Sequence, residues 1–215
     1  MPTSVPASMA ASALLAHLVG IDDALLARAA KIRLVCFDVD GTLTDGRLIY
    51  GGREENDTGE ANESTREFKA FHVHDGQGLA LLRKAGIEVA LITARRSAAA
   101  AQRARDLGVR AYTGSADKLA QVDALCTELG IAREHVAFMG DDLPDLTAMR
   151  AVGLAVAPAN AHAWTAADAH WRTRARAGKG AARELCDLIL IAQGTLPDAL
   201  SARDGGLDDI GSDRA

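Results

Sequence analysis

The stretch CFDVDGTLTDG, residues 36–46, decides the fold, because an apolar run ends there at two aspartates, Asp38 and Asp40. The apolar run begins at Ile32, and its near-continuity over residues 32–38 predicts a strand that is covered on both faces. Burial explains the strand but not two like charges at its end. If the strand continues to Asp40, both carboxylates project to the same side.

Helices and strands alternate along most of the chain. This alternation predicts an α/β fold, a Rossmann-like parallel sheet with helices on both faces. The expected helices are 22–30, 78–86, 96–108, 116–130, 144–153 and 180–194, and the further expected strands are 87–93, 109–114, 135–140, 154–158 and 169–173.

Two strand-like pieces, RLIYGG and REFKAFHV, interrupt the alternation and predict a β-hairpin over residues 47–74. An acidic loop joins them, which gives the hairpin a long tip at 53–67. A two-stranded element is too small to bury its own apolar residues, so we expect hairpins of several subunits to pair. The apolar residues in question are Leu48, Tyr50, Phe68 and Phe71.

The length of 215 residues favours one main domain, which we place at 31–194. An extension with a helix, 1–30, precedes it, and a flexible tail, 195–215, follows it.

The composition argues against several classes of partner. A net charge of −5 and an aromatic content of 4% disfavour a nucleic-acid-binding surface. No apolar run is long enough to span a membrane, and residues 1–18 lack the charged n-region of a secretory signal. The three cysteines form no C-x-x-C pair, which disfavours a disulfide or zinc framework. We therefore expect a cytoplasmic protein with buried thiols.

Acidic residues also follow another expected strand, in FMGDDLPD, which contains Asp141, Asp142 and Asp145. Ligands of open parallel sheets bind beyond the carboxyl ends of the strands, so these carboxylates are expected to converge with those of residues 36–46. An all-oxygen ligand set of this kind suits Mg²⁺. Thr93, at the end of LIT, and Lys118, near the start of a helix, are expected at the same edge.

Weaker candidates lie elsewhere. His72 and His74 share a face of the hairpin, where a substrate contact, a zinc pair and plain surface placement are all open. Asp75 suits a helix N-cap. The segment around Lys179 lacks the residues of a nucleotide-binding P-loop, and its cations, Arg172, Arg174, Arg176, Lys179 and Arg183, either hold an anionic substrate or are ordinary surface charge.

The motifs DVDGTLTDG, ITARRS, ADK and GDDLPD together resemble the four ordered motifs of the haloacid dehalogenase superfamily of phosphatases, over residues 32–194. The resemblance implies that Asp38 is the nucleophile and Asp40 the general acid and base. It implies Mg²⁺ bound by Asp38, the Asp40 backbone carbonyl and Asp141. Thr93 and Lys118 would contact the phosphate, and Asp142 and Asp145 would orient metal-bound waters or Lys118. For these two, and for Asp145 especially, a role as helix N-terminal acids that complement the helix dipole stays open.

Within the superfamily, LTDG, FKAFHVHDGQGL and GKGAARELCDLILIAQG resemble the group of 3-deoxy-D-manno-octulosonate 8-phosphate phosphatases. This implies hydrolysis of that sugar-acid phosphate in lipopolysaccharide precursor synthesis, a hairpin in place of a cap domain, and a homotetramer. The chain departs from many members at His74, where they carry Arg, at Ala94, where they carry Gly, and in its longer hairpin tip.

Other functions stay open. The substrate is alternatively a nonulosonate 9-phosphate or another small phosphoester. The chain is alternatively a non-catalytic phospho-receiver or partner-binding domain. A receiver does not need a general acid two residues after its phosphorylated aspartate, so Asp40 favours the enzyme.

Overall fold

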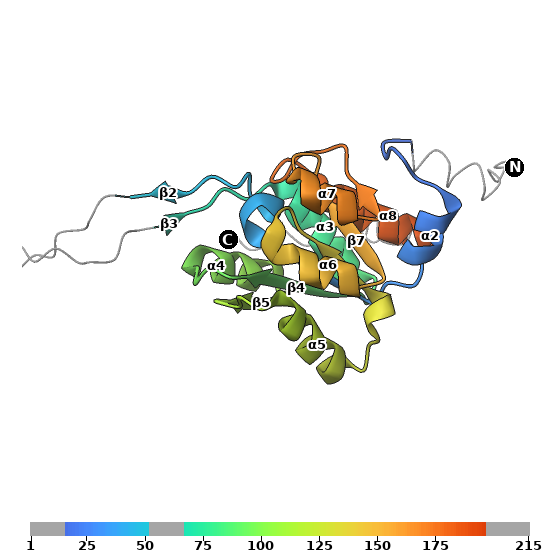
Figure 1. The fold of residues 1–215 in the computed structure, drawn as a ribbon, viewed down its shortest axis with the longest axis horizontal. Helices are drawn as coiled ribbons and strands as arrows, with labels where there is room; N and C mark the ends of the chain where they lie inside the picture. Colours follow the sequence, from blue (N-terminus) through green and yellow to red (C-terminus); the bar gives the residue numbers. More distant parts are fainter. Residues whose placement is uncertain (1–15, 52–66, 197–215) are drawn as a thin grey trace, which may run out of the picture.

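The computed structural model describes residues 16–51 and 67–196. The expected hairpin tip apart from Glu67, the first half of the expected N-terminal extension and nearly all of the expected tail lie outside the described residues. A six-stranded parallel sheet has the order β5-β4-β1-β6-β7-β8 (Figure 1). Its strands are β1 (Leu34–Phe37), β4 (Glu88–Thr93), β5 (Arg110–Thr113), β6 (Val136–Met139), β7 (Leu154–Ala157) and β8 (Trp171–Arg172).

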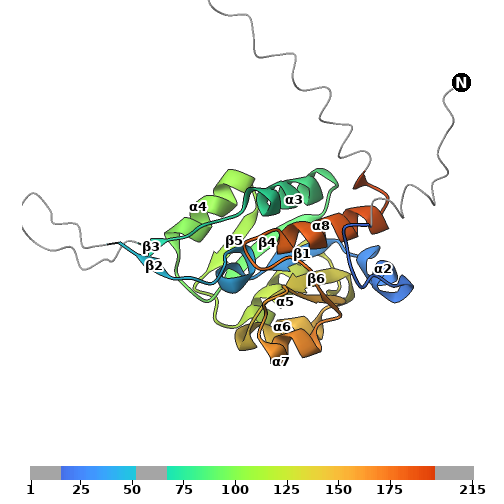
Figure 2. The same cartoon turned by 90° about the horizontal axis from the view of Figure 1, so that it is seen from above.

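Helices cover both faces of this sheet. The helices are α2 (Asp23–Ala29), α3 (Val73–Lys84), α4 (Ala98–Leu107), α5 (Lys118–Leu129), α6 (Leu146–Ala151), α7 (Ala163–Asp168) and α8 (Ala181–Ala192). Figure 2 shows α3, α4 and α8 on one side of the sheet and α5, α6 and α7 on the other. The architecture confirms the predicted fold class.

The central strand β1 explains the apolar run that opens the decisive stretch. Val35 and Phe37 belong to the core cluster under α3 and α8, whereas Leu34 and Cys36 belong to the cluster under α5 and α6. All four side chains are buried, because alternate positions of a strand face opposite sides and both sides of this sheet are covered.

The hairpin consists of β2 (Ile49–Tyr50) and β3 (Glu67–Phe68), which pair antiparallel and extend away from the sheet (Figures 1 and 2). Its second strand is shorter than predicted, because α3 already begins at Val73. Phe71 was expected among the hairpin's unburied residues, but it is half-buried against the main core.

The local prediction for Asp75 is wrong, and one short helix was not predicted. The expected N-cap Asp75 lies inside α3, where His72 caps the helix, and the buried Asp75 carboxylate instead accepts the N–H groups of Gly180 and Arg183 at 3.2 and 2.9 Å. It therefore satisfies donors at the start of α8 rather than those of its own helix. Helix α7 was not predicted, because six residues give too little periodicity.

The prediction of buried thiols is correct for two of the three cysteines and wrong for Cys126. The three cysteines are free, but only Cys36 and Cys186 are buried, and Cys126 is half-buried. Within the described residues, no helix has both the length and the apolar character that crossing a bilayer requires.

Candidate active site

Three neighbouring strands bring the candidate residues to one edge of the sheet. Strands β4, β1 and β6 lie side by side and run parallel, so their carboxyl ends meet. Asp38 follows β1 directly, Thr93 ends β4, and Asp141 follows β6 by two residues. Lys118, the first residue of α5, reaches the same edge. This is the edge at which ligands of open α/β sheets bind.

The strand β1 does not continue to Asp40, so the condition under which both carboxylates would share one strand face is not met. The strand ends at Phe37, and a tight helical turn, Val39–Leu43, follows. Gly41 makes this turn possible, because its φ is +95° and a Cβ atom there would lie 2.2 Å from Asp141 Oδ2. Asp38 and Asp40 therefore enter the site from a turn, not from one strand face.

Lys118 joins two of the buried carboxylates. Its Nζ donates to Oδ1 of Asp38 and to Oδ1 of Asp145, at 2.5 Å each. The second oxygen of Asp145 accepts the backbone N–H groups of Asp141 and Asp142, at 2.9 and 3.2 Å. Asp145 thus fixes both the lysine and the loop that carries Asp141.

Asp141 and Asp142 differ in their surroundings. The hydroxyl of Thr42 donates to Oδ1 of Asp141 at 3.0 Å, which orients that carboxylate toward the turn after β1. Asp142 is exposed, and its side chain accepts the N–H of Leu143 at 2.8 Å, as a cap of the short helical turn Leu143–Asp145.

Burial and close packing of the carboxylates raise the pKa of two of them, Asp38 and Asp141. Burial, and then the negative charge of Asp145, raise the pKa of Asp38 to about 8 and that of Asp141 to about 6. Burial by itself would lower the pKa of Lys118, but the charges of Asp38 and Asp145 outweigh it, so this pKa is raised and the lysine stays protonated.

The same crowding fits a divalent cation. Oxygens of Asp38, Asp141 and Asp145 lie within 4.8 Å of one another, the one such group of three potential ligands in the described part of the chain. Oxygen donors with several negative charges suit Mg²⁺, and a bound cation would favour the charged form of the two carboxyl groups whose pKa is raised.

Asp40 has a different set of neighbours. One of its oxygens, Oδ1, forms an ion pair with the ammonium of Lys69. The other, Oδ2, is buried and has no hydrogen-bond partner among the described residues, and Nε of Arg95 lies 3.9 Å from it. One oxygen is therefore held by the hairpin, and the other has no hydrogen bond from any described residue.

A cavity of about 370 Å³ opens above these groups. All seven of the predicted catalytic, metal, phosphate and orienting residues line it. The lining comprises Asp38, Asp40, Gly41, Gly46, Leu48, Thr93, Ala94, Arg95, Lys118, Asp141, Asp142, Pro144 and Asp145.

The two weaker substrate candidates are not part of this cavity. His74 is exposed at the start of α3, where its backbone N–H donates to Nδ1 of His72 at 3.3 Å. Lys179 is exposed on the loop before α8. That loop does approach the turn after β1, because the N–H of Gly178 donates to the carbonyl of Thr42 at 3.2 Å.

Sequence reasoning missed Lys69 and Arg95. Lys69 lies in FKAFHV, which was interpreted only as a hairpin strand, and Arg95 lies in ITARRS, where only Thr93 was singled out. Arg95 comes two residues after Thr93, so the end of β4 was a usable signal for it. Lys69 had no comparable signal, because the direction of the hairpin relative to the sheet is a tertiary feature.

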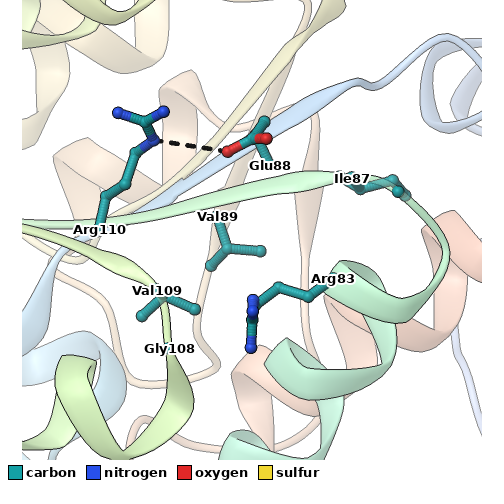
Figure 3. Close-up of a pocket in the computed structure, with 8 residues that line it drawn as sticks. Arg83, Ile87, Glu88, Val89, Gly108, Val109 and Arg110 are labelled. Atoms are coloured by element: carbon teal, nitrogen blue, oxygen red, sulfur yellow. Dashed lines mark hydrogen bonds and ion pairs between the residues drawn. The ribbon is translucent and has the colours of Figure 1, made fainter.

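A second pocket lies at the opposite end of the sheet, at the amino ends of β4 and β5 (Figure 3). Its two arginines have protein partners. Arg110 pairs with Glu88 and Glu128, and Arg83 donates to the carbonyl of Leu107 at 2.7 Å. The arginines therefore stabilise helix and strand ends, and we assign this pocket no ligand.

The site combines a carboxylate paired with a buried lysine, a second carboxylate two residues later, and a cluster that suits Mg²⁺, which defines a phosphate-ester hydrolase. A model of the haloacid dehalogenase-like hydrolases matches residues 111–185. The 3-deoxy-D-manno-octulosonate 8-phosphate phosphatase KdsC of Yersinia pestis is 45% identical over 180 residues, 83% of this chain and 90% of the relative.

Solved structures agree with this match. A hypothetical protein from Xanthomonas campestris is 54% identical, with a TM-score of 0.76 over 86% of this chain and 95% of that one. The Moraxella catarrhalis 3-deoxy-D-manno-octulosonate 8-phosphate phosphatase, crystallised with magnesium, phosphate and KDO, is 39% identical, with a TM-score of 0.75 over 83% and 97%. The chain belongs to the haloacid dehalogenase superfamily of phosphatases, in the branch of these relatives, and is a phosphoric monoester hydrolase.

Proposed function

We propose that this enzyme hydrolyses 3-deoxy-D-manno-octulosonate 8-phosphate to the free sugar acid and phosphate, a step of lipopolysaccharide precursor synthesis. The observation that carries the chemistry is the pair Asp38 and Asp40 in one cavity, the first held by Lys118 and the second by Lys69. The names of the relatives support the choice of substrate.

In the first step, a carboxylate oxygen of Asp38 attacks phosphorus, and the bond from phosphorus to the sugar oxygen breaks. The departing alkoxide takes a proton from Oδ2 of Asp40, which has no other hydrogen-bond partner among the described residues. The products are an aspartyl-phosphate on Asp38, the sugar acid and the Asp40 carboxylate.

In the second step, a water oxygen attacks the phosphorus of the aspartyl-phosphate, and the bond from phosphorus to Asp38 breaks. Asp40 takes the proton that it gave away, so both aspartates return to their starting state. In this proposal Lys118 and the Thr93 hydroxyl hold the phosphoryl oxygens, which is supported by the presence of both residues with Asp38 in the lining of the cavity.

We propose that Asp38, Asp141 and the backbone carbonyl of Asp40 hold Mg²⁺, with Asp145 fixing the surrounding loop. When bound there, the cation would neutralise negative charge on the transferring phosphoryl group.

A sugar acid adds a carboxylate to the substrate, and the cavity offers a cation for it. The Arg95 side chain lines the cavity and is 47% exposed, so its guanidinium is accessible to a ligand. A guanidinium binds a carboxylate through two parallel hydrogen bonds.

The substrate is tested by phosphate release from a panel of 3-deoxy-D-manno-octulosonate 8-phosphate, a nonulosonate 9-phosphate, glucose 6-phosphate and glycerol 3-phosphate. We expect kcat/KM to be highest for the octulosonate, by at least about tenfold over the two non-acidic esters, because they lack the carboxylate. Equal rates on all four would contradict the assignment, and a preference for the nonulosonate would replace it.

We also propose a homotetramer in which hairpins of different subunits pair. Four hairpin side chains are at least 42% exposed in one chain, namely Leu48, Ile49, Tyr50 and Phe68. An exposed apolar cluster of this kind favours association. Light scattering at micromolar concentration should give a molar mass of about four times the 22.5 kDa of one chain. A fully active monomer would rule this assembly out.

A cytoplasmic location is the remaining part of the proposal. Its support is that Cys36, Cys126 and Cys186 are free thiols, as is usual in a reducing compartment.

A further inference from the structure

Lys69 is an unusual residue for a hairpin arm. It follows β3 directly, yet its side chain is only 1% exposed, while the neighbouring Phe68 is 47% exposed. A lysine ammonium is rarely buried unless it is paired. The Lys69 ammonium is paired twice, with Oδ1 of Asp40 and, at 2.9 Å, with Oε1 of Glu67.

The pairing continues to the body of the domain. The hydroxyl of Ser97 donates to Oε2 of Glu67 at 2.6 Å, and the same hydroxyl accepts the N–H of Ala100 at the start of α4. Ser97 is buried, at 4% exposure. A continuous chain of contacts thus runs from α4 through Glu67 and Lys69 to Asp40. It connects the hairpin to the candidate general acid.

Only one of the two carboxylate oxygens of Asp40 belongs to this chain of contacts. Lys69 holds Oδ1, whereas Oδ2 is buried without a hydrogen bond from any described residue. Arg95 lies 3.9 Å from Oδ2, beyond hydrogen-bond distance. A carboxyl group fixed at one oxygen can present the other to a leaving oxygen in a single orientation.

We propose that Lys69 is a positioning residue for proton transfer by Asp40, and that the hairpin contributes to the chemistry through it. This inference rests on the proposed function, in which Asp40 protonates the leaving alkoxide. The contrasting possibility is that Lys69 only anchors the hairpin. The two differ in what happens when the leaving group needs no proton.

The test compares kcat/KM for two substrates, an alkyl phosphate (3-deoxy-D-manno-octulosonate 8-phosphate) and p-nitrophenyl phosphate. The p-nitrophenolate anion leaves without a proton, and kcat/KM includes only the steps up to its departure. In Lys69→Met we expect kcat/KM for the alkyl phosphate to fall roughly 100-fold, as for a misplaced catalytic group. The value for p-nitrophenyl phosphate should fall less than about threefold.

Lys69→Arg keeps a donor and should recover most of the alkyl phosphate activity, which also covers the case in which Lys69→Met does not fold. Lys84→Met, which removes an exposed lysine of α3, is the matched control and should leave both substrates unchanged. Equal losses with both substrates in Lys69→Met, or no recovery in Lys69→Arg, would overturn the positioning role.

Asp40→Asn separates this inference from the proposed function. If kcat/KM falls selectively for the alkyl phosphate in Asp40→Asn but not in Lys69→Met, only the role of Lys69 is wrong. If kcat/KM falls equally for both substrates in Asp40→Asn, the assignment of Asp40 as the general acid is wrong. The role proposed for Lys69 is then wrong as well.

Discussion

Asp38→Asn should abolish turnover, lowering kcat by roughly 10⁴-fold or more, because an amide cannot form the aspartyl-phosphate. The fold should be retained, since asparagine has nearly the same shape and Lys118 keeps its 2.5 Å contact with Asp145. The substitution also removes one of three crowded carboxylates, two of them buried and one half-buried, which offsets the lost ion pair. Phosphate release and the circular dichroism melting curve are the two measurements.

Asp123→Asn is the matched control for this change. Asp123 is a residue of α5 outside the cavity, and its carboxylate forms an exposed ion pair with Arg133, which this substitution removes. The activity of this variant should equal that of the wild type. A second check is trapping, because the wild type should incorporate a phosphoryl group that Asp38→Asn does not. Normal turnover by folded Asp38→Asn protein would refute the nucleophile assignment.

Removal of divalent cations should lower activity by at least about 100-fold, and Mg²⁺ should restore it. The expected size follows because charge neutralisation on a phosphoryl group is worth several kcal/mol, and about 1.4 kcal/mol corresponds to a tenfold change in rate. The measurement is phosphate release after dialysis against EDTA, with the residual metal content determined. Full activity in metal-free protein would exclude the role of the cation.

A readout that does not depend on turnover is the melting temperature. A cation that binds the native state alone stabilises it, so Mg²⁺ should raise the melting temperature in a concentration-dependent manner. Asp141→Asn should weaken this shift, because it removes a proposed ligand whose oxygen is already oriented by Thr42. Asp123→Asn should show the full shift. An unchanged shift in Asp141→Asn would place the cation elsewhere.

Much of the site could be predicted from the sequence, for a physical reason. In a parallel sheet the carboxyl ends of the strands share one edge, so residues that follow buried apolar runs must meet there. This places Asp38, Thr93 and Asp141 together without any knowledge of long-range contacts. Lys118 followed from its position at the start of a helix, which lies at the same edge.

Lys69 and Asp75 could not be assigned in this way. The orientation of the hairpin depends on contacts of Glu67 with Ser97 that are distant in sequence, so the burial of Lys69 against Asp40 has no local signature. Asp75 has the local character of an N-cap, but it binds the start of α8, 105 residues away. Short-range preference is weak compared with packing between helices.

The sequence by itself determined the fold class, the superfamily and the sheet edge at which the candidate site lies, because apolar runs and the acidic motifs after them are local patterns. Only the tertiary structure decided which partner each buried charge has. It showed that β1 ends before Asp40, that Lys118 joins Asp38 to Asp145, and that the hairpin delivers Lys69. Such partners are set by distances between side chains of different elements, which follow from packing and not from the order of residues along the chain.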